Sequence, residues 1–369
     1  MSSAEFLAQL RGAHKAEEPG ARGIERVARN PDCLRLRALT IAGFTPASAA
    51  EILGVQSKEG QSPFALSMGM RFDKHLVENG AANLFALYRK EGLLSVQEAK
   101  FIAIDDFAPG ASPQALQKRL GETRRLLDAK RRGDPNAPNI IVKPRLLVDL
   151  VGVPHAIEPD YLVAADTDVF YRTGELKSYP DRGGKTDPAD IRSACRQAAV
   201  GVVGLRQALA SLGVNDPAQI AGPAADLVLR VTGLFMPTLS RMAIEGEVAS
   251  VERAISEAPT NLQELEAMLP ANASFEEAST IAALPNNYRP SCKEHCAMWE
   301  HCRAQALDHG HPVVLGDQAA ELLAPAGSIA RGLELMRRQG QPPRNSAEAA
   351  LGEELRAAND TLRRAVGDG

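Results

Sequence analysis

The stretch from Glu158 to Tyr179, EPDYLVAADTDVFYRTGELKSY, places two apolar runs on either side of a short polar segment. Residues 161–163 have the β-branched and aromatic composition of a strand, and residues 169–171 open a second strand. Between them, Asp166-Thr167-Asp168 supplies residues that favour a turn. This part of the chain is therefore expected to form a β-hairpin, and the fold must be built around it.

The charged side chains of this hairpin fall on one face. Residues two apart in a strand share a face, so Glu175 and Lys177 are expected on one side while Leu176 points into the core. A slight offset of the hairpin would bring Asp160 beside Glu175. Two neighbouring carboxylates repel each other unless a cation lies between them, and Mg²⁺ or Mn²⁺ suits their oxygen ligands. Lys177 would face the same point, where an ammonium group positions water or stabilises a phosphate.

The remaining sequence predicts a helix-rich α/β protein around the hairpin. A hydrophobic content of 44% and a charged content of 24% are normal for a globular chain, and only 4% of the residues are aromatic. Residues 139–150 predict an apolar strand, which with 156–164 and 169–179 would make an antiparallel meander. Helices are predicted at 45–53, 63–92, 112–132 and 189–212, and residues 214–285 are expected to be helical as well.

The predicted helix at 112–132 has a strongly basic face, although the net charge of the whole chain is −4. A nucleic-acid site in such a chain must be a local patch rather than a property of the whole surface. This face is the best local candidate for contacts to phosphates. Its basic residues are Lys118, Arg119, Arg124, Arg125, Lys130, Arg131 and Arg132.

The N-terminus lacks the basic-then-apolar pattern of a signal peptide, and no apolar run approaches eighteen residues. A cytoplasmic protein without a membrane partner is therefore expected. In a reducing compartment, five cysteines predict metal ligands, catalytic residues or core residues rather than disulfides.

Three of these cysteines, Cys292, Cys296 and Cys302, lie within eleven positions together with the single tryptophan of the chain. Three clustered thiolates need a fourth ligand to complete a tetrahedral zinc site or an iron–sulfur cluster. Zinc could take His295, His301 or Cys33. A [4Fe–4S] cluster prefers a fourth cysteine, which only Cys33 or Cys195 can supply.

The order of these residues resembles a known nuclease branch. The chain carries Cys33, His75, Asp160, Glu175-Leu176-Lys177 and Gln197, followed by the cysteine triplet. This order is similar to that of the RecB-like PD-(D/E)xK nucleases with an iron–sulfur clamp, a branch that includes the AddB nuclease domain and the CRISPR-associated adaptation nucleases. The resemblance covers about residues 30–310. Many members carry a tyrosine four residues after the glutamine, where this chain has Gly201.

The resemblance implies a restriction-endonuclease-like core, in which helices flank a small mixed sheet, with extensive helical additions and an Fe–S clamp. It implies that Asp160 and Glu175 ligate Mg²⁺ or Mn²⁺ together with His75 and the carbonyl of Leu176. Lys177 would orient the attacking water, and Gln197 would support the site. Cys33, Cys292, Cys296 and Cys302 would hold a [4Fe–4S] cluster, which leaves Cys195 as a buried core thiol.

On this basis residues 1–310 are expected to form the nuclease core, with a helical insertion at about 206–285, and residues 311–369 a helical extension with a polar tail. The implied activity is metal-dependent hydrolysis of DNA, at single strands or ends, in repair, recombination or antiviral defence. A helicase or defence-complex subunit is the implied protein partner. Two alternatives stay open: a non-catalytic DNA-binding scaffold subunit, and a zinc-stapled helical interaction protein.

Overall fold

The computed structural model describes residues 3–56, 63–98, 100–150, 152–183, 186–231, 236–256 and 262–366. The chain forms two compact units, which differ from the predicted division at residue 310. Unit 1 comprises residues 1–32, 37–45 and 60–274, and unit 2 comprises residues 33–36, 46–59 and 275–369.

Unit 1 contains a mixed sheet of six strands, in the order β1-β2-β5-β6-β7-β8. The pairs β1–β2 and β6–β7 are parallel, whereas β2–β5, β5–β6 and β7–β8 are antiparallel. The α/β class and the mixed sheet are therefore as the sequence predicts. The strands are β1 (Phe101–Ala103), β2 (Ile140–Val142), β5 (Tyr161–Val163), β6 (Arg172–Asp181), β7 (Ala224–Val231) and β8 (Pro237–Ala243).

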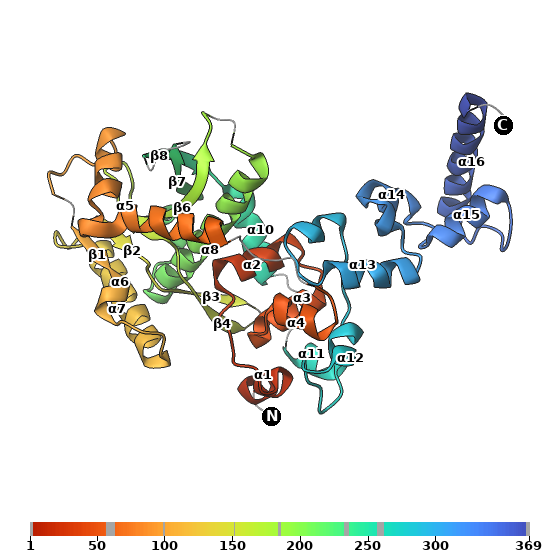
Figure 1. Ribbon diagram of the computed structural model, residues 1–369, viewed down its shortest axis with the longest axis horizontal. Helices are drawn as coiled ribbons and strands as arrows, with labels where there is room; N and C mark the ends of the chain where they lie inside the picture. The colour runs from red at the N-terminus through yellow and green to blue at the C-terminus, as the bar shows by residue number, and fades with distance from the viewer. Residues whose placement is uncertain are drawn as a thin grey trace. The chain divides into compact units, whose positions relative to one another are not determined.

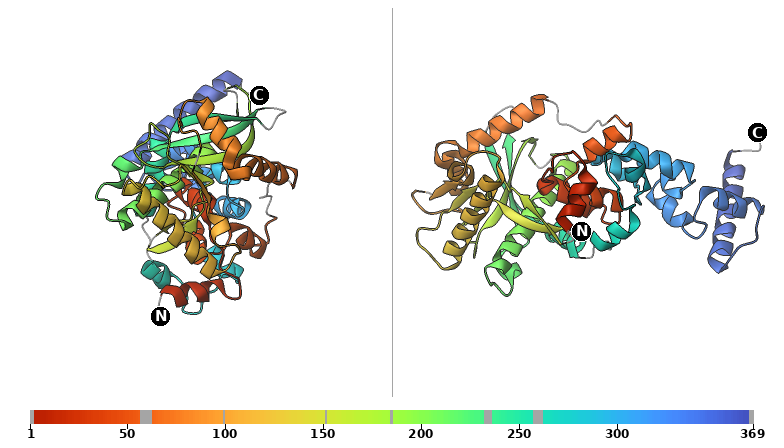
Figure 2. Two further views of the ribbon diagram at one scale, coloured as in Figure 1. Left: turned by 90° about the vertical axis from the view of Figure 1, so that its left-hand side faces the viewer. Right: turned by 90° about the horizontal axis from the view of Figure 1, so that it is seen from below.

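Helices cover both faces of this sheet (Figure 1), and Figure 2 shows the same arrangement from two other sides. On one face, apolar residues of α5 pack against β2, β5 and the side chain of Leu176 from β6. On the other face, α2, α7, α8 and α10 share a core with the alternate side chains of the strands. The period-2 alternation of a strand thus sends Leu176 to one core and Glu175 and Lys177 to the opposite side.

The helices of unit 1 are α1 (Ser3–Arg11), α2 (Gly20–Arg29), α5 (Pro63–Lys90), α6 (Ile104–Phe107), α7 (Pro113–Arg131), α8 (Pro188–Ser211), α9 (Pro217–Ile220), α10 (Glu245–Ser256) and α11 (Leu262–Met268). Helix α3 (Leu34–Ala42) begins in unit 2 and continues in unit 1. Unit 2 adds α4 (Pro46–Ile52), α12 (Ala278–Ala283), η1 (Pro290–Glu294), α13 (Trp299–Asp308), η2 (Pro312–Leu315), α14 (Asp317–Leu323), α15 (Ile329–Arg337) and α16 (Ser346–Val366). Among the described helices, none has the length and apolar character needed to cross a membrane.

The predicted strand at 139–150 is wrong as a single element. The chain turns at Lys143, whose φ of 50° is left-handed, and at the following Pro144, so that β2 ends before them. Strand β3 (Leu146–Leu150) then pairs with β4 (Val153–Ile157) in a separate two-stranded sheet. The predicted antiparallel order of the strands at 139–150, 156–164 and 169–179 is nevertheless present, because β2 pairs with β5 and β5 pairs with β6 in antiparallel fashion.

The prediction that residues 214–285 are helical is also wrong, because β7 and β8 lie within it. Strand β7 has the run Asp226-Leu-Val-Leu-Arg-Val, and Leu227, Val228 and Leu229 are all buried. A continuous apolar run of this length fits a buried strand as well as a helix, and only its parallel pairing with β6 distinguishes the two.

The long helix that the sequence predicts from Pro63 is interrupted in its second half. Asn79, Gly80 and Ala81 have left-handed φ values of 53°, 72° and 57°. Asparagine and glycine tolerate this conformation, so the Asn-Gly pair ends one helical segment and the next begins after it. Helix α5 is therefore two helices joined by a short left-handed turn.

Gly174 on β6 lies under the ring of Tyr161 on β5. A Cβ atom at this position would lie 1.9–2.3 Å from three ring carbons. We expect Gly174→Ala to destabilise the protein by about 1–3 kcal/mol or more, because the ring and strand must move apart. Urea unfolding would measure this loss. Gly246→Ala is the control, since nothing lies within 4 Å of its Cβ and it is helical; equal effects of the two substitutions would contradict the account.

In unit 2, helices α14, α15 and α16 share apolar contacts, and ion pairs around the buried Glu348 of α16 add to them. The Glu348 carboxylate, with a fully buried side chain, accepts hydrogen bonds from Arg331 Nη2 at 2.9 Å and from Arg344 Nε at 2.6 Å. The backbone N–H of Arg344 adds a third bond at 2.6 Å. These donors lower the pKa of Glu348 to about 2 from the usual 4.5.

The stabilisation from Glu348 should therefore depend on pH. A carboxyl group whose pKa is lower in the folded state stabilises the fold above its unfolded pKa, and the contribution is lost as pH falls toward the folded value. We expect Glu348→Gln to lower the unfolding temperature at pH 7, with the difference from wild type shrinking below about pH 4.5 and vanishing near pH 2. Thermal unfolding across this pH range provides the measurement, and a difference that does not depend on pH would refute the role of the charge.

Candidate active site

The β5–β6 hairpin brings Asp160 and Glu175 together. Tyr161 pairs with Gly174 in the sheet, so the next residues outward, Asp160 and Glu175, lie opposite each other. The backbone N–H of Leu176 donates to Asp160 Oδ2 at 2.7 Å. The hairpin offset predicted from the sequence is therefore present, and one carboxylate oxygen of Asp160 is fixed by the backbone of β6.

Lys177 lies between these carboxylates and α8. Its ammonium forms an ion pair with Glu175 Oε1 and donates to Gln197 Oε1 at 3.0 Å. Gln197 is held in turn by Ser193 one helical turn earlier, at 3.4 Å. Burial lowers the pKa of Lys177, but Glu175 and Asp160 outweigh it and raise the pKa, so the ammonium stays charged. Gln197 is thus in direct contact with Lys177, and its role as a supporting residue stays a prediction.

Burial raises the pKa values of both carboxyl groups. The pKa of Glu175 rises to about 7, because burial and the charges of Asp160 and Asp73 outweigh the opposing effect of Lys177. Burial also raises the pKa of Asp160, against the lowering effects of Lys177 and the Leu176 hydrogen bond. Two neighbouring carboxyl groups with raised pKa values and a specific cationic partner are typical of functional sites.

Asp73 on α5 is the residue that the sequence reasoning missed. Burial and the charge of Asp160 raise its pKa to about 7, and its own charge acts on Glu175. His75, which the resemblance implies as a ligand, is on the same helix, and Asn83 Nδ2 donates to its backbone carbonyl at 2.7 Å. Asp73 of α5 therefore acts electrostatically on both acids of the pair, and the role of His75 as a ligand stays a prediction.

The site has more negative than positive groups. Asp73, Asp160 and Glu175 face one partly buried ammonium, Lys177, and the more distant Lys143. Carboxylate oxygens are the donors that Mg²⁺ and Mn²⁺ prefer, and such a cation would relieve the repulsion between them. The donor chemistry therefore fits a hard divalent ion. Within the described ranges, however, no three Cys, His, Asp or Glu side chains are already arranged to hold a metal.

Close packing of α8 on the sheet sets the position of Gln197. A Cβ atom on Gly201 would lie 2.6 Å from Thr173 Cγ2 and 3.3 Å from Pro159 Cγ. No larger side chain fits there. Contact at Gly201 brings the preceding helical turn, with Gln197, up to Lys177.

The four cysteines that the resemblance implies as cluster ligands are all buried residues of unit 2. Cys33 directly precedes α3, Cys292 lies in η1, Cys296 follows η1, and Cys302 lies in α13. Burial raises the pKa of Cys296, and the charges of Cys302, Cys33 and Cys292 raise it further. Cysteines separated by more than 250 positions in the sequence therefore share one neighbourhood.

Arg35 brings a buried positive charge to this neighbourhood. Its Nη1 donates to Cys302 Sγ at 3.1 Å, and its Nη2 donates to the carbonyl of Leu284 and to Gln305 Oε1. Burial raises the pKa of Cys302 to about 11, against the lowering effect of Arg35. A guanidinium beside buried thiols favours thiolates, which are the form that binds metal. The chemistry of the four cysteines therefore fits a metal or cluster bound by thiolates. Among the described residues, however, no three of these side chains are close enough together to hold a metal ion.

The remaining cysteine has a different environment. Cys195 is part of the α8 face that packs into the unit 1 core, and burial raises its pKa to about 11. Unit 2, by contrast, contains the other four cysteines. Cys195 is a buried core thiol, as the sequence analysis expects.

The predicted basic face of α7 has less unbalanced positive charge than the sequence suggests. Arg119 is a buried residue that binds the carbonyls of Ala108 and Gly110 and pairs with Asp105, so its place on a DNA-facing surface is wrong. The helical period turns position 119 toward the core, which residue type alone does not reveal. The exposed arginines are largely paired within the helix: Arg125 with Glu122, and Arg131 and Arg132 with Asp128. Lys118 and Arg124 are exposed, and Arg124 donates to the Ser211 carbonyl.

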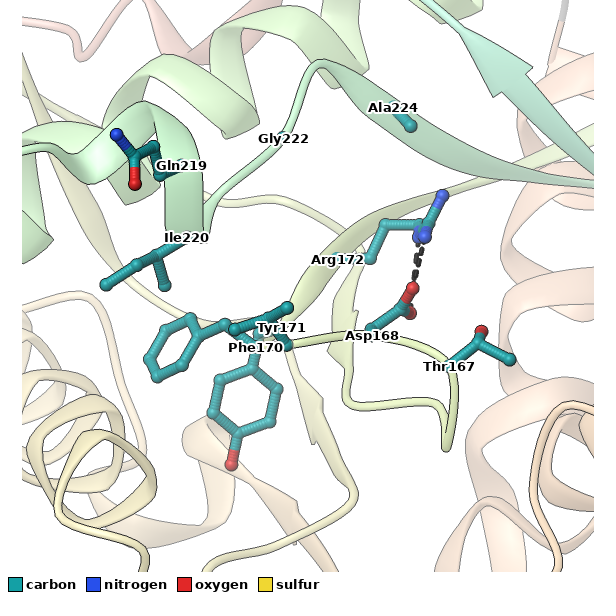
Figure 3. Close-up of a pocket in the computed structure, with 10 residues that line it drawn as sticks. Thr167, Asp168, Phe170, Tyr171, Arg172, Gln219, Ile220, Gly222 and Ala224 are labelled. Atoms are coloured by element: carbon teal, nitrogen blue, oxygen red, sulfur yellow. Dashed lines mark hydrogen bonds and ion pairs between the residues drawn. The ribbon is translucent and has the colours of Figure 1, made fainter.

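A separate cavity of about 220 Å³ opens beside the loop before β6 (Figure 3). At its edge Asp168 forms an ion pair with Arg172, and Asp168 also pairs with Arg241 at 3.3 Å. Arg172 is in β6 and Arg241 is in β8, so these ion pairs attach the loop at Asp168, a predicted turn residue, to the sheet. Asp168 is not part of the acidic pair.

Comparison with known proteins gives no family assignment. No family model and no curated protein matches the chain. A solved structure titled "Crystal structure of SSO0001" aligns at 14% identity over 47% of this chain and 84% of that one. Its TM-score of 0.19 is too low for the likeness to support a statement about fold or function.

Proposed function

We propose that this protein is a metal-dependent deoxyribonuclease of the RecB-like PD-(D/E)xK type, with a restriction-endonuclease-like core in unit 1. The observation that carries the proposal is the set of buried Glu175 and half-buried Asp160 and Lys177, in which the lysine bonds to Gln197. Two acids and a fixed ammonium at one point of a sheet suit phosphodiester hydrolysis better than a structural role, because burying them costs stability.

The residues have distinct roles in this proposal. Asp160 and Glu175, with Asp73 nearby, would hold Mg²⁺ or Mn²⁺. When bound, that ion would supply charge neutralisation at the scissile phosphate and an acidified water. Lys177 would place its charged donors toward the water and the phosphate oxygens. Gln197 would keep the ammonium in position, since its amide oxygen accepts from Lys177 Nζ.

The four cysteines of unit 2 support a second part of the proposal, an Fe–S clamp. Cys33, Cys292, Cys296 and Cys302 would hold a [4Fe–4S] cluster that supplies folding energy rather than chemistry at the phosphate. Such a cluster would tie the segment at residues 33–36 to the later part of unit 2. Zinc bound with His295 or His301 is the competing occupant, and metal analysis distinguishes the two.

Hydrolysis itself is the test of the proposed function. Wild-type protein, purified anaerobically, should cleave labelled single-stranded DNA or DNA ends in Mg²⁺ or Mn²⁺ and lose that activity in EDTA. DNA of several forms (linear single strand, blunt duplex, overhang and closed circle) would show which substrate is cut. Absence of cleavage on every form with either metal would overturn the nuclease proposal and favour a non-catalytic DNA-binding subunit, such as one working with a helicase or a defence complex.

A further inference from the structure

Helix α2 presents arginines on a single face. Arg22, Arg26 and Arg29 stand at positions i, i+4 and i+7, so their side chains project from the same side. The opposite side of the helix, with Ile24 among its residues, is buried in the unit 1 core. The arginines are therefore held by a helix that is fixed in the fold.

Helix α8 adds two more arginines next to α2. Arg192 and Arg196 are one turn apart, and Arg196 Nη1 lies 3.9 Å from Glu25 Oε1 of α2. Arg29 Nε lies 3.8 Å from the same oxygen. Burial raises the pKa of Glu25, whereas the charges of Arg29, Arg196, Arg26 and Arg22 lower it. Arginines of both helices thus face one buried carboxylate, and Arg22 and Arg192 at the two ends of this group are exposed.

This arginine surface continues to the candidate active site. Arg196 is the neighbour of Gln197, which accepts the hydrogen bond from Lys177. Tyr179 connects the two places from β6: the charges of Lys177 and of Arg22 both lower its pKa, against the raising effects of burial and Asp190. One helix, α8, therefore carries both Arg196 of the arginine surface and Gln197, the hydrogen-bond partner of Lys177.

We propose that this α2–α8 arginine surface, formed by Arg22, Arg26, Arg29, Arg192 and Arg196, binds the phosphodiester backbone of single-stranded DNA and leads it to Lys177. The inference rests on the proposed nuclease function and names the surface that its substrate contacts. The α7 face is the alternative; there the exposed Arg125, Arg131 and Arg132 each form an ion pair with a carboxylate of the same helix. Guanidinium–phosphate contacts fix the position of the strand without reading its sequence.

Binding without hydrolysis tests this inference. The affinity of full-length protein for a fluorescently labelled oligothymidylate would be measured by anisotropy in EDTA over a series of salt concentrations. Arg22→Ala/Arg192→Ala removes two exposed charges of the α2–α8 arginine surface. Arg125→Ala/Arg131→Ala removes two exposed charges from α7. Arg22→Lys/Arg192→Lys keeps the charge and reports whether the positions tolerate substitution.

Arg22→Ala/Arg192→Ala should raise Kd by about 10-fold or more near 0.1 M salt and should reduce the slope of log K against log salt by about 1.4. The α7 variant should change Kd by less than about twofold, and the lysine variant should retain most of the binding. Equal or larger losses in the α7 variant, an unchanged salt slope in the α2–α8 variant, or no binding by wild type would each overturn the inference. Tight, salt-dependent binding without any cleavage in Mg²⁺ or Mn²⁺ would support the DNA-binding role of the α2–α8 arginine surface and would contradict the proposed nuclease activity.

Discussion

Lys177→Ala is expected to lower the rate of DNA hydrolysis by at least about 10²-fold while DNA binding is largely kept. Glu175 and Gln197 hold the Lys177 ammonium in one position, so it is oriented before the substrate binds. In the variant, a water molecule would not be held in the same position. Removal of one such preorganised donor from an enzyme site typically costs about 10²–10³ in rate. Single-turnover cleavage of a labelled strand in Mn²⁺ measures the effect directly.

Two further variants separate catalysis from general charge. Lys90→Ala removes an exposed lysine at the end of α5 and should leave the rate within about twofold of wild type. Gln197→Ala keeps the ammonium but removes its support, so it should cause a smaller loss than Lys177→Ala. If Lys177→Ala cleaves DNA as fast as Lys90→Ala, the lysine has no catalytic role and the proposed assignment of the site fails.

Cys33→Ala is expected to remove iron from the protein and to reduce its soluble yield sharply. Cys33 is buried in the same neighbourhood as Cys292, Cys296 and Cys302, although it is far from them in sequence. A structural metal site contributes folding free energy on the order of 10 kcal/mol, so the loss of one ligand should unfold the segments that it joins. Iron and sulfide analysis after anaerobic purification, with the visible absorbance of the protein, gives the readout.

Cys195→Ala is the matched control for this experiment. Its thiol is also buried, but in the unit 1 core, so its removal should cost only the packing of a small side chain and leave the iron content unchanged. Loss of iron in Cys195→Ala and its retention in Cys33→Ala would show that the wrong fourth ligand is assigned. Colourless wild-type protein that contains one zinc per chain would instead favour a zinc site with His295 or His301.

The local geometry of the acidic pair follows from the sequence because it depends on short-range rules. Alternation along β6 and its antiparallel pairing with β5 suffice to place Asp160 opposite Glu175 and to turn Leu176 into the core. The buried state of Cys195 and the helical start near Cys33 follow from similarly local patterns.

The features that the sequence did not predict depend on tertiary contacts. Asp73 reaches the acidic pair only because α5 crosses the sheet, and nothing in its local sequence distinguishes it from a surface carboxylate. Arg119 is buried because it binds carbonyls eleven and nine residues earlier in the chain. The α2–α8 arginine surface combines two helices that are more than 150 residues apart. Strand β7 is recognisable only by its pairing with β6.

Binding of Mn²⁺ is the most direct test of the claim that the acids of the β5–β6 hairpin hold a catalytic cation. The paramagnetic resonance signal of free Mn²⁺, titrated with protein, counts bound ions without requiring turnover. We expect wild type to bind Mn²⁺ at a site that is lost in Asp160→Asn/Glu175→Gln, a change that preserves side-chain shape. Equal Mn²⁺ binding by wild type and by this double variant would contradict the account.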